Sequence, residues 1–182
     1  CLSDVKVGEN YALVISTSSG LWRYDLGDTV QFTQLEPYRI IVTGRIKHFI
    51  SAFGEHVIAK EVETTIKEVS SKLNLKVREF TVAPEVTPKV GLPFHEWFIE
   101  FDEINDNLDE IEVIMDKIMQ KQNIYYKDLI QGKILSPLRI TKVKKGGFNL
   151  YMKSVGKLGG QNKVPHLSND RKIANQLKNY TI

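Results

Sequence analysis

Two residues of opposite charge each follow a glycine near the start of the chain. Asp28 comes after Gly27, and Arg45 comes after Gly44. A carboxylate in such a place can accept hydrogen bonds from the vicinal hydroxyls of a ribose, and a guanidinium can hold a hydroxyl or a phosphate with its planar fork. The pair therefore suits a sugar-phosphate ligand. The ordinary alternatives are a turn aspartate that satisfies its own backbone and an arginine in a surface salt bridge.

The run 156–165 is the second stretch that could do chemistry. Its three glycines within five residues predict a mobile loop, and Lys157 and Lys163 stand within that loop. A flexible loop that carries a compact ammonium can reach into a site and neutralise charge developing on a phosphate. The complete phosphate-loop pattern G-x-x-x-x-G-K-[ST] is absent from the sequence, and a solvated loop is the alternative interpretation.

Two further residues that could take part in chemistry lie between these two stretches. Gly54 permits a positive φ or the close approach of a ligand. His56 could act as an acid or a base, but no set of side chains with metal-ligand spacing accompanies it, so we interpret it as a polar loop histidine. The sequence contains no G-x-S-x-G, no G-x-G-x-x-G and no cysteine in a nucleophile context, and no metal site is expected.

Composition and charge limit the class of protein. The 182 residues are 42% hydrophobic and 26% charged, which is ordinary for a globular protein. No apolar run approaches the roughly 18 residues that cross a bilayer. The net charge is only +3, yet Asp170 is the sole acid from Arg139 to the end, where ten basic residues gather. A basic face of this kind favours a polyanionic partner (a nucleotide, a nucleic acid or an anionic membrane) or is simply solvated.

The elements that must position these residues follow from the spacing of apolar side chains. We expect a hairpin over 11–24 that breaks at 26–28, and a last helix capped by Ser168. The other expected strands are 29–35, 39–43, 77–86, 97–101 and 138–143, and the expected helices are 58–73, 108–119, 125–130, 148–155 and 169–178. This order predicts an α+β fold, with a small mixed β-sheet flanked by helices and preceded by strands that look like the edge of a larger N-terminal domain.

Several spaced motifs together resemble the C-terminal signatures of adenylate-forming enzymes, the superfamily of acyl-CoA synthetases, luciferases and peptide-synthetase adenylation domains. The first is Tyr24-Asp25-Leu26-Gly27-Asp28, and the others lie at 42–47, 53–57 and 61–63. The runs 22–28 and 159–165 are most similar to the auxin-responsive promoter family of acyl-acid amido synthetases, in its bacterial form. The resemblance covers essentially the whole chain.

The resemblance implies a role for each matching residue. Asp28 would bind the ribose hydroxyls of ATP or of the adenylate, and Arg45 would contact the nucleotide. Lys47 would be the hinge about which a C-terminal domain, 45–182, rotates relative to 1–44, the terminal strands of a large N-terminal domain. Lys163 would stabilise the transition state of adenylation. The secondary candidates are Lys157, Tyr24 and Gly54.

The implied reaction joins a carboxylic acid and ATP into acyl-AMP and pyrophosphate, then transfers the acyl group to an amine, an amino acid or a thiol. ATP and Mg²⁺ would be the cofactors, and catalysis would be mostly positioning and charge stabilisation. The resemblance implies a cytoplasmic ligase with no nucleic-acid or membrane partner, of which this chain is a piece that is inactive alone. The acid and the acceptor are not specified, because the acyl pocket lies outside the chain. The alternative is a basic α+β module that binds nucleic acid without catalysis, although aromatic residues do not interleave with the basic ones.

Overall fold

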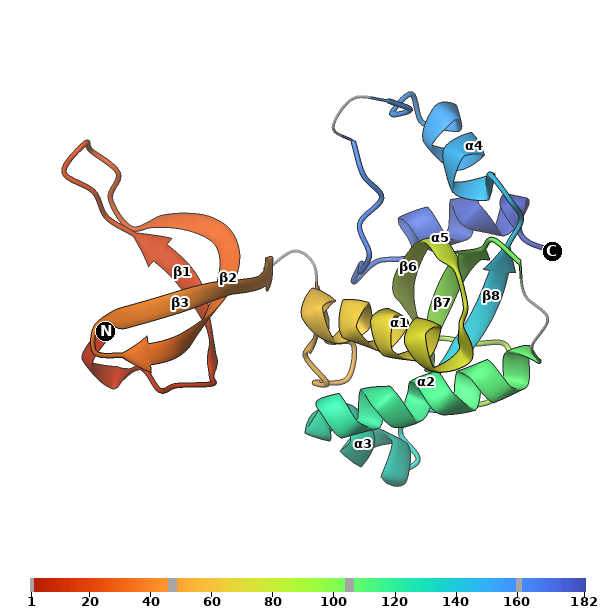
Figure 1. The fold of residues 1–182 in the computed structure, drawn as a ribbon, viewed down its shortest axis with the longest axis horizontal. Helices are drawn as coiled ribbons and strands as arrows, with labels where there is room; N and C mark the ends of the chain where they lie inside the picture. Colours follow the sequence, from red (N-terminus) through yellow and green to blue (C-terminus); the bar gives the residue numbers. More distant parts are fainter. Residues whose placement is uncertain (1, 46–48, 104–106, 160–161) are drawn as a thin grey trace.

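The computed structural model describes residues 2–45, 49–103, 107–159 and 162–182, and Figure 1 shows them as two lobes. The N-terminal lobe is a three-stranded antiparallel sheet in the order β1-β2-β3, preceded by a short 3-10 helix at Leu2–Asp4. Its strands are β1 (Asn10–Ile15), β2 (Tyr24–Leu35) and β3 (Tyr38–Arg45). This lobe carries the first pair of candidate residues.

The break expected at 26–28 is wrong, because β2 runs on through these residues. Gly27 takes a φ of +74°, which a glycine adopts at little cost, and the register between β1 and β2 shifts between Ala12 and Val14. The strand therefore bulges where the sequence pattern suggested an end. Asp28 lies inside β2 rather than at a strand end.

The C-terminal lobe is built on a mixed sheet in the order β6-β7-β8. β6 (Val77–Glu85) pairs antiparallel with β7 (Phe94–Phe101), and β7 pairs parallel with β8 (Arg139–Val143). A two-stranded ribbon, β4 (Phe49–Ile50) and β5 (Val57–Ile58), precedes them. The helices are α1 (Ala59–Leu73), α2 (Leu108–Gln122), α3 (Ile124–Gln131), α4 (Gly147–Ser154) and α5 (Lys172–Leu177), followed by a 3-10 turn at Lys178–Tyr180. The expected α+β class is confirmed.

Helices cover both faces of this sheet, as Figure 1 shows. Alternate residues of β7 point to opposite sides: Trp97 and Ile99 pack in the cluster that contains α1, α2 and α3, whereas Phe98 packs in the cluster that contains α4 and α5. All eight residues of β7 are buried as a result. Because both faces of β7 are covered, the sequence of 97–101 is largely apolar.

Single β-bridges lie beyond the two outer strands of the sheet. Leu167 forms a parallel bridge with Val82 of β6, and Thr181 forms an antiparallel bridge with Val143 of β8. The segment before α5 therefore runs along β6 and is not part of that helix. The expected cap at Ser168 is wrong: α5 begins at Lys172, and the Asp170 carboxylate accepts the Lys172 N–H at 2.9 Å.

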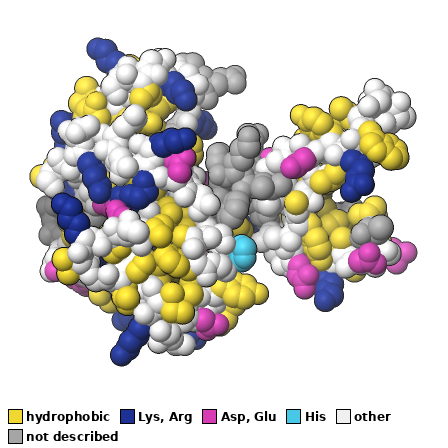
Figure 2. All heavy atoms as spheres, turned by 180° about the vertical axis from the view of Figure 1, so that it is seen from behind, with side chains coloured by type: hydrophobic (Ala, Val, Ile, Leu, Met, Phe, Trp, Pro, Cys, Tyr) yellow, Lys and Arg dark blue, Asp and Glu magenta, His cyan; other side chains and the backbone are white. Residues whose placement is uncertain are grey.

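Apolar side chains remain exposed on the N-terminal lobe. In its three strands, only Val30, Phe32 and Thr43 are buried among the side chains that the structure describes. Val42 is 67% exposed, and Trp22, in the loop between β1 and β2, is 82% exposed. Figure 2 shows hydrophobic side chains on the surface of this lobe, at the right of that view. In the described residues, no helix has the length and apolar character needed to cross a membrane.

Candidate functional site

Asp28 and Arg45 stand opposite each other in the N-terminal sheet. The register of β2 with β3 pairs their Cα atoms directly, and Thr29 is paired with Gly44 beside them. Asp28 is half-buried, and Arg45 is the last residue of β3. The backbone therefore brings together the two residues that the sequence suggested as a sugar-phosphate pair.

The neighbouring Asp25 satisfies a turn. Its Oδ1 accepts the backbone N–H of Gly27 at 2.8 Å, which is the local hydrogen bond typical of an aspartate in a bend. Tyr24 opens β2 opposite Ile15 and is 51% exposed.

The remaining early candidates lie near the junction of the lobes. Gly54 has a φ of +90°, so the backbone conformation that its position suggested is present, and a Cβ there would meet nothing within 4 Å. His56 is exposed, and its Nδ1 lies 3.2 Å from the Ser51 hydroxyl. Lys47, the proposed hinge, lies outside the described residues.

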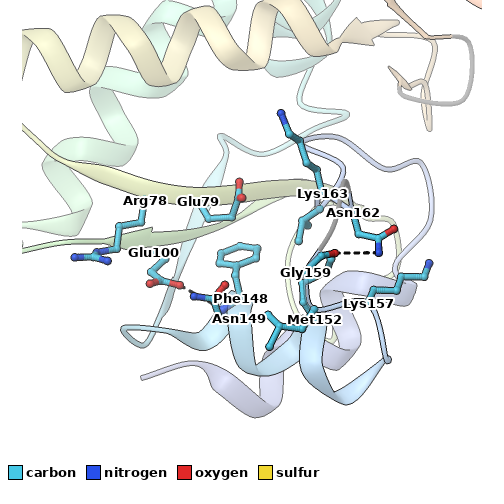
Figure 3. Close-up of a pocket in the computed structure, with 12 residues that line it drawn as sticks. Arg78, Glu79, Glu100, Phe148, Asn149, Met152, Lys157, Gly159, Asn162 and Lys163 are labelled. Carbon is cyan, nitrogen blue, oxygen red and sulfur yellow. Dashed lines mark hydrogen bonds between the residues drawn. The ribbon is translucent and has the colours of Figure 1, made fainter.

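Lys157 and Lys163 line one pocket, a cavity of about 380 Å³ in the C-terminal lobe. Figure 3 shows the two lysines pointing in different directions from the loop that carries them. Within the described part of the chain, neither ammonium forms an ion pair, and both side chains are exposed. The other lining residues are Arg78, Glu79, Glu100, Phe148, Asn149, Met152, Leu158, Gly159, Asn162 and Val164. None of them comes from β1–β3, so the lysines and the Asp28–Arg45 pair occupy separate sites.

Glu100 and Arg78, two other charged residues that line this pocket, already have hydrogen-bond partners. The Glu100 carboxylate accepts the N–H groups of Gly146 and Phe148 at 2.7 and 3.3 Å, which fixes the start of α4. Arg78 donates from Nε to Asp102 at 2.6 Å. The two loop lysines are therefore the cations of this pocket that remain available to an anion.

His166 directly follows the loop 156–165 that carries the two lysines, which we call the lysine loop. It holds the end of this loop against α1 and β6. Its Nδ1 lies 3.0 Å from the Glu63 carboxylate of α1, and its Nε2 lies 3.3 Å from Glu79 of β6. The ring stacks on Phe80, with centroids 4.2 Å apart. The hydrogen bond to Glu79 raises the pKa of His166 above its usual 6.5; burial opposes this rise, and Glu63 adds to it.

A second charged cluster, which the sequence did not single out, lies buried beside the junction. Glu55 and His95 are 0% and 1% exposed, and their Oε1 and Nε2 atoms are 2.9 Å apart. Glu55 also accepts the Phe53 N–H at 2.8 Å, and Asn123 donates to its carbonyl. Burial raises the pKa of Glu55, but the hydrogen bonds to its carboxylate, first that of His95 and then those of backbone N–H groups, outweigh burial and leave the pKa lowered. Since 40 residues separate the pair, no local sequence pattern could have revealed it.

A small polar pocket of about 250 Å³ lies between the two lobes. Asn10, Gln31 and Thr43 line it from the N-terminal sheet, and Ile58, Lys60, Glu61 and Gln122 line it from the other lobe. Burial raises the pKa of Glu61, more than its hydrogen bonds from the Ile58 N–H and Asn123 lower it. The Glu61 carboxylate accepts the Ile58 N–H at 3.0 Å and so caps the start of α1.

The basic residues of the C-terminal segment do not form one free face. Arg171 donates to the Pro84 carbonyl and pairs with Glu85 and Glu96. Lys145 lies 3.7 Å from Asp102. Lys144 and Arg139 lie over the rings of Tyr180 and Phe94. Acids and aromatic rings therefore lie against several of these cations, which weakens the argument for a nucleic-acid surface.

Comparisons with known proteins agree on one family. The chain matches the GH3 family C-terminal domain over residues 60–172 and the GH3 family central domain over residues 1–45. It is 27% identical over 192 residues to indole-3-acetic acid-amido synthetase GH3.10 of Arabidopsis thaliana, covering 100% of this chain and 32% of that protein. It is 29% identical over 175 residues to GH3.3 of the same plant, covering 90% of this chain and 29% of that protein.

Solved structures share the fold. The structure titled GH3.15 acyl acid amido synthetase superposes with a TM-score of 0.75 at 23% sequence identity, over 100% of this chain and 34% of that one. The chain thus spans about a third of the length of the relatives that it matches.

Proposed function

Since the chain belongs to the GH3 family, we propose that it is the C-terminal part of an ATP-dependent acyl acid amido synthetase. The family assignment confirms the resemblance seen in the motifs. The proposed protein activates a carboxylic acid as acyl-AMP, releases pyrophosphate, and transfers the acyl group to the amine of an amino acid. The similar Arabidopsis proteins are named as synthetases that join indole-3-acetic acid in an amide, which supports an acid and an amine as substrates.

The division of the candidate residues between two lobes is the observation that carries this proposal. Asp28 and Arg45 are paired in the N-terminal sheet, whereas Lys163 stands on an exposed loop of the other lobe without an ion partner among the described residues. Such a division suits a reaction in which one lobe holds the nucleotide and the other brings a cation to it. In this proposal Asp28 binds the ribose hydroxyls, Arg45 contacts the nucleotide, and Lys163 stabilises the charge that develops on the α-phosphate.

Movement of the second lobe would connect the two half-reactions. We place the boundary at 44–47, with 1–44 as the end of the preceding domain, 45–182 as the mobile domain and Lys47 as the hinge. Rotation about this point would withdraw Lys163 after adenylation and present another face for acyl transfer. Lys157 is the second candidate for the catalytic lysine, because it lines the same pocket.

The exposed apolar sheet supports the inference that further protein packs against this chain. At alternate positions of β3, Tyr38, Ile40 and Val42 are 50%, 46% and 67% exposed. Contiguous apolar surface of this kind is typical of an interface. In the proposed whole protein, the remaining two thirds of the length would cover it and supply the acyl pocket.

ATP and Mg²⁺ are the proposed cofactors. In the part of the chain that the structure describes, no three His, Cys, Asp or Glu side chains are grouped so as to hold a metal. In this proposal the phosphates of ATP hold Mg²⁺, which would neutralise phosphate charge. The proposed location is the cytoplasm, where ATP is available.

Separate assays of the two half-reactions test the role of Lys163. In the protein that contains this chain, Lys163→Ala should lower acyl-AMP formation about 10²- to 10³-fold, measured by exchange of pyrophosphate into ATP. Amide formation from supplied acyl-AMP should change far less. Lys157→Ala, from the same loop, is the matched control and should cost less than about tenfold. Equal losses in both half-reactions would contradict the proposed role.

The nucleotide role of Asp28 can be tested against its neighbour. Asp28→Asn should raise the KM for ATP by about tenfold or more, because an amide replaces one acceptor of the ribose hydroxyls with a donor. Asp25→Asn is the control, since Asp25 serves the turn at Gly27. Similar changes in KM for the two variants would remove Asp28 from the nucleotide site.

A further inference from the structure

We propose that His166 is a positioning residue for Lys163: as an imidazolium it ties the end of the lysine loop to α1 and β6. The proposal rests on the catalytic role proposed above for Lys163. It adds a residue whose contacts, among the described residues, lie inside the C-terminal lobe, so the tie would travel with that lobe when it moves.

Both ring nitrogens of His166 face a carboxylate. One ring nitrogen faces Glu63 at 3.0 Å and the other faces Glu79 at 3.3 Å. A neutral imidazole carries a single N–H and can donate to only one carboxylate, whereas the imidazolium donates to both. The two glutamates come from different elements, α1 and β6, so the charged ring links three segments. Among the described residues, these two carboxylates are the charged groups seen to face the ring, and Phe80 packs beneath it.

The chain on either side of His166 is fixed to the same strand. The Thr81 hydroxyl donates to the Pro165 carbonyl at 2.6 Å, and the Val82 N–H donates to the His166 carbonyl at 3.0 Å. In the opposite direction, the Ser168 N–H donates to the Val82 carbonyl at 2.9 Å. Residues 165–168 thus form a short anchored segment along β6.

Only two residues separate His166 from Lys163. Val164 is 6% exposed and packs in the cluster formed with α4 and α5, and Pro165 has a restricted φ. Three residue steps span at most about 11 Å, so the Lys163 backbone stays within that distance of His166 while His166 is held. Placement errors of about 1 Å can cost a hundredfold in rate, which makes this short tether relevant to catalysis.

The charge of His166 makes the tether sensitive to pH. Because its pKa is raised by Glu79 and Glu63, the imidazolium persists above pH 6.5. The charge and the second donor are present below that pH and are lost as the pH rises through the raised pKa of the folded protein. The expected pH dependence therefore runs from a held loop in mildly acidic solution to a looser loop in alkaline solution.

Two variants separate this role from simple structural support. His166→Gln removes the charge and one donor, whereas His166→Arg keeps a permanent charge and several donors. In the protein that contains this chain at pH 6, the Gln variant should exchange the backbone amides of 162–168 about tenfold faster than wild type. It should also lose about ten- to a hundredfold in kcat for acyl-AMP formation, with little change in the KM for ATP. The Arg variant should restore both, and His56→Gln, a change at an exposed histidine outside the loop, should alter neither.

Comparison at two pH values completes the test. The difference in amide exchange between wild type and His166→Gln should shrink at a pH well above the His166 pKa, while His166→Arg should stay protected. Unchanged exchange in His166→Gln at pH 6 would overturn the tether, whatever the protein catalyses. Faster exchange with unaltered acyl-AMP formation would overturn the positioning role. Absence of acyl-AMP formation by wild type would instead contradict the proposed function, and the exchange data would still decide whether the tether exists.

Discussion

The two three-stranded sheets of this chain bury their residues very differently. Every residue of β7 is buried, and helices pack on both sides of it. In β1, by contrast, no residue is buried, and β3 carries exposed Ile40, Ile41 and Val42. One sheet is the centre of a closed core, and the other presents apolar side chains to solvent.

The difference extends to polar groups. The C-terminal lobe buries Glu55, His95 and Asp116, each with hydrogen-bond partners, which requires a core that excludes water. On the strands of the N-terminal sheet, Thr43 is the buried polar residue among the described side chains. The proposed nucleotide residues therefore lie on the sheet that exposes apolar side chains, while Lys163 belongs to the lobe with a closed core.

The two tryptophans of the chain give the largest expected contrast. Trp97 is 0% exposed in β7, and Trp22 is 82% exposed beside β2. We expect Trp97→Ala to lower the free energy of unfolding of the 182-residue chain by about 3–5 kcal/mol, because it leaves a cavity in the core. Trp22→Ala should change it by less than about 0.5 kcal/mol. Urea unfolding followed by circular dichroism measures both, and comparable losses would refute the contrast.

The buried pair should have a smaller, pH-dependent effect. At pH 7, Glu55→Gln should lower the free energy of unfolding by about 2 kcal/mol, because the amide cannot replace a carboxylate between His95 and two N–H groups. The pKa of Glu55 is below its usual 4.5, so its stabilisation is present above that pH and is lost as the pH falls through the lowered value. Wild type and variant should therefore converge in acid. A constant difference from pH 7 to pH 3 would show that the charge of Glu55 is not the cause.

The start of α2 gives a moderate test of the same lobe. The Asn107 side chain accepts the Asp109 N–H at 3.2 Å and caps the helix. Asn107→Ala should cost about 1 kcal/mol of unfolding free energy. Asn107→Ser keeps an acceptor and should lose only a few tenths. Equal losses for Ala and Ser would show that the cap contributes little.

The smallest effect is expected on the exposed face of the N-terminal sheet. Val42→Thr keeps the β-branched shape and should change the stability of the 182-residue chain by less than about 0.5 kcal/mol. In the whole protein, where we propose that this face is covered, the same change should cost about 1 kcal/mol or more. Equal effects in the two settings would mean that nothing packs on Val42.

The sequence predicted those parts of the fold that depend on local spacing. The stripe Val62, Ile66 and Val69 predicted α1, and Asn74 ends that helix in the left-handed conformation, with a φ of 53°. The bulge at Gly27 was missed because a glycine that ends a strand and one that bends it look alike in the sequence. The cap at Ser168 was missed because 165–168 is held by bonds to β6, about 85 residues away in the chain.

The candidate site likewise has features that local sequence can predict and features that depend on distant residues. The sequence could place Asp28 near Arg45, because consecutive strands usually pair. It could not find the His166 contacts, since Glu63 lies 103 residues earlier and nothing local links the two. The functional roles of Asp28, Arg45, Lys47 and Lys163 remain predictions from the resemblance, to be tested as described above.

The two isolated bridges beside the mixed sheet have a consequence for association. A strand at the edge of a sheet offers unpaired N–H and C=O groups to any other strand, which is a common route to aggregation. Here Leu167 occupies the open side of β6, and Thr181 occupies the open side of β8, where the Ile182 N–H also bonds to the Lys142 carbonyl. Short pieces of its own chain thus pair with part of each margin of the sheet. Such pairing leaves fewer backbone groups of this lobe open to a foreign strand.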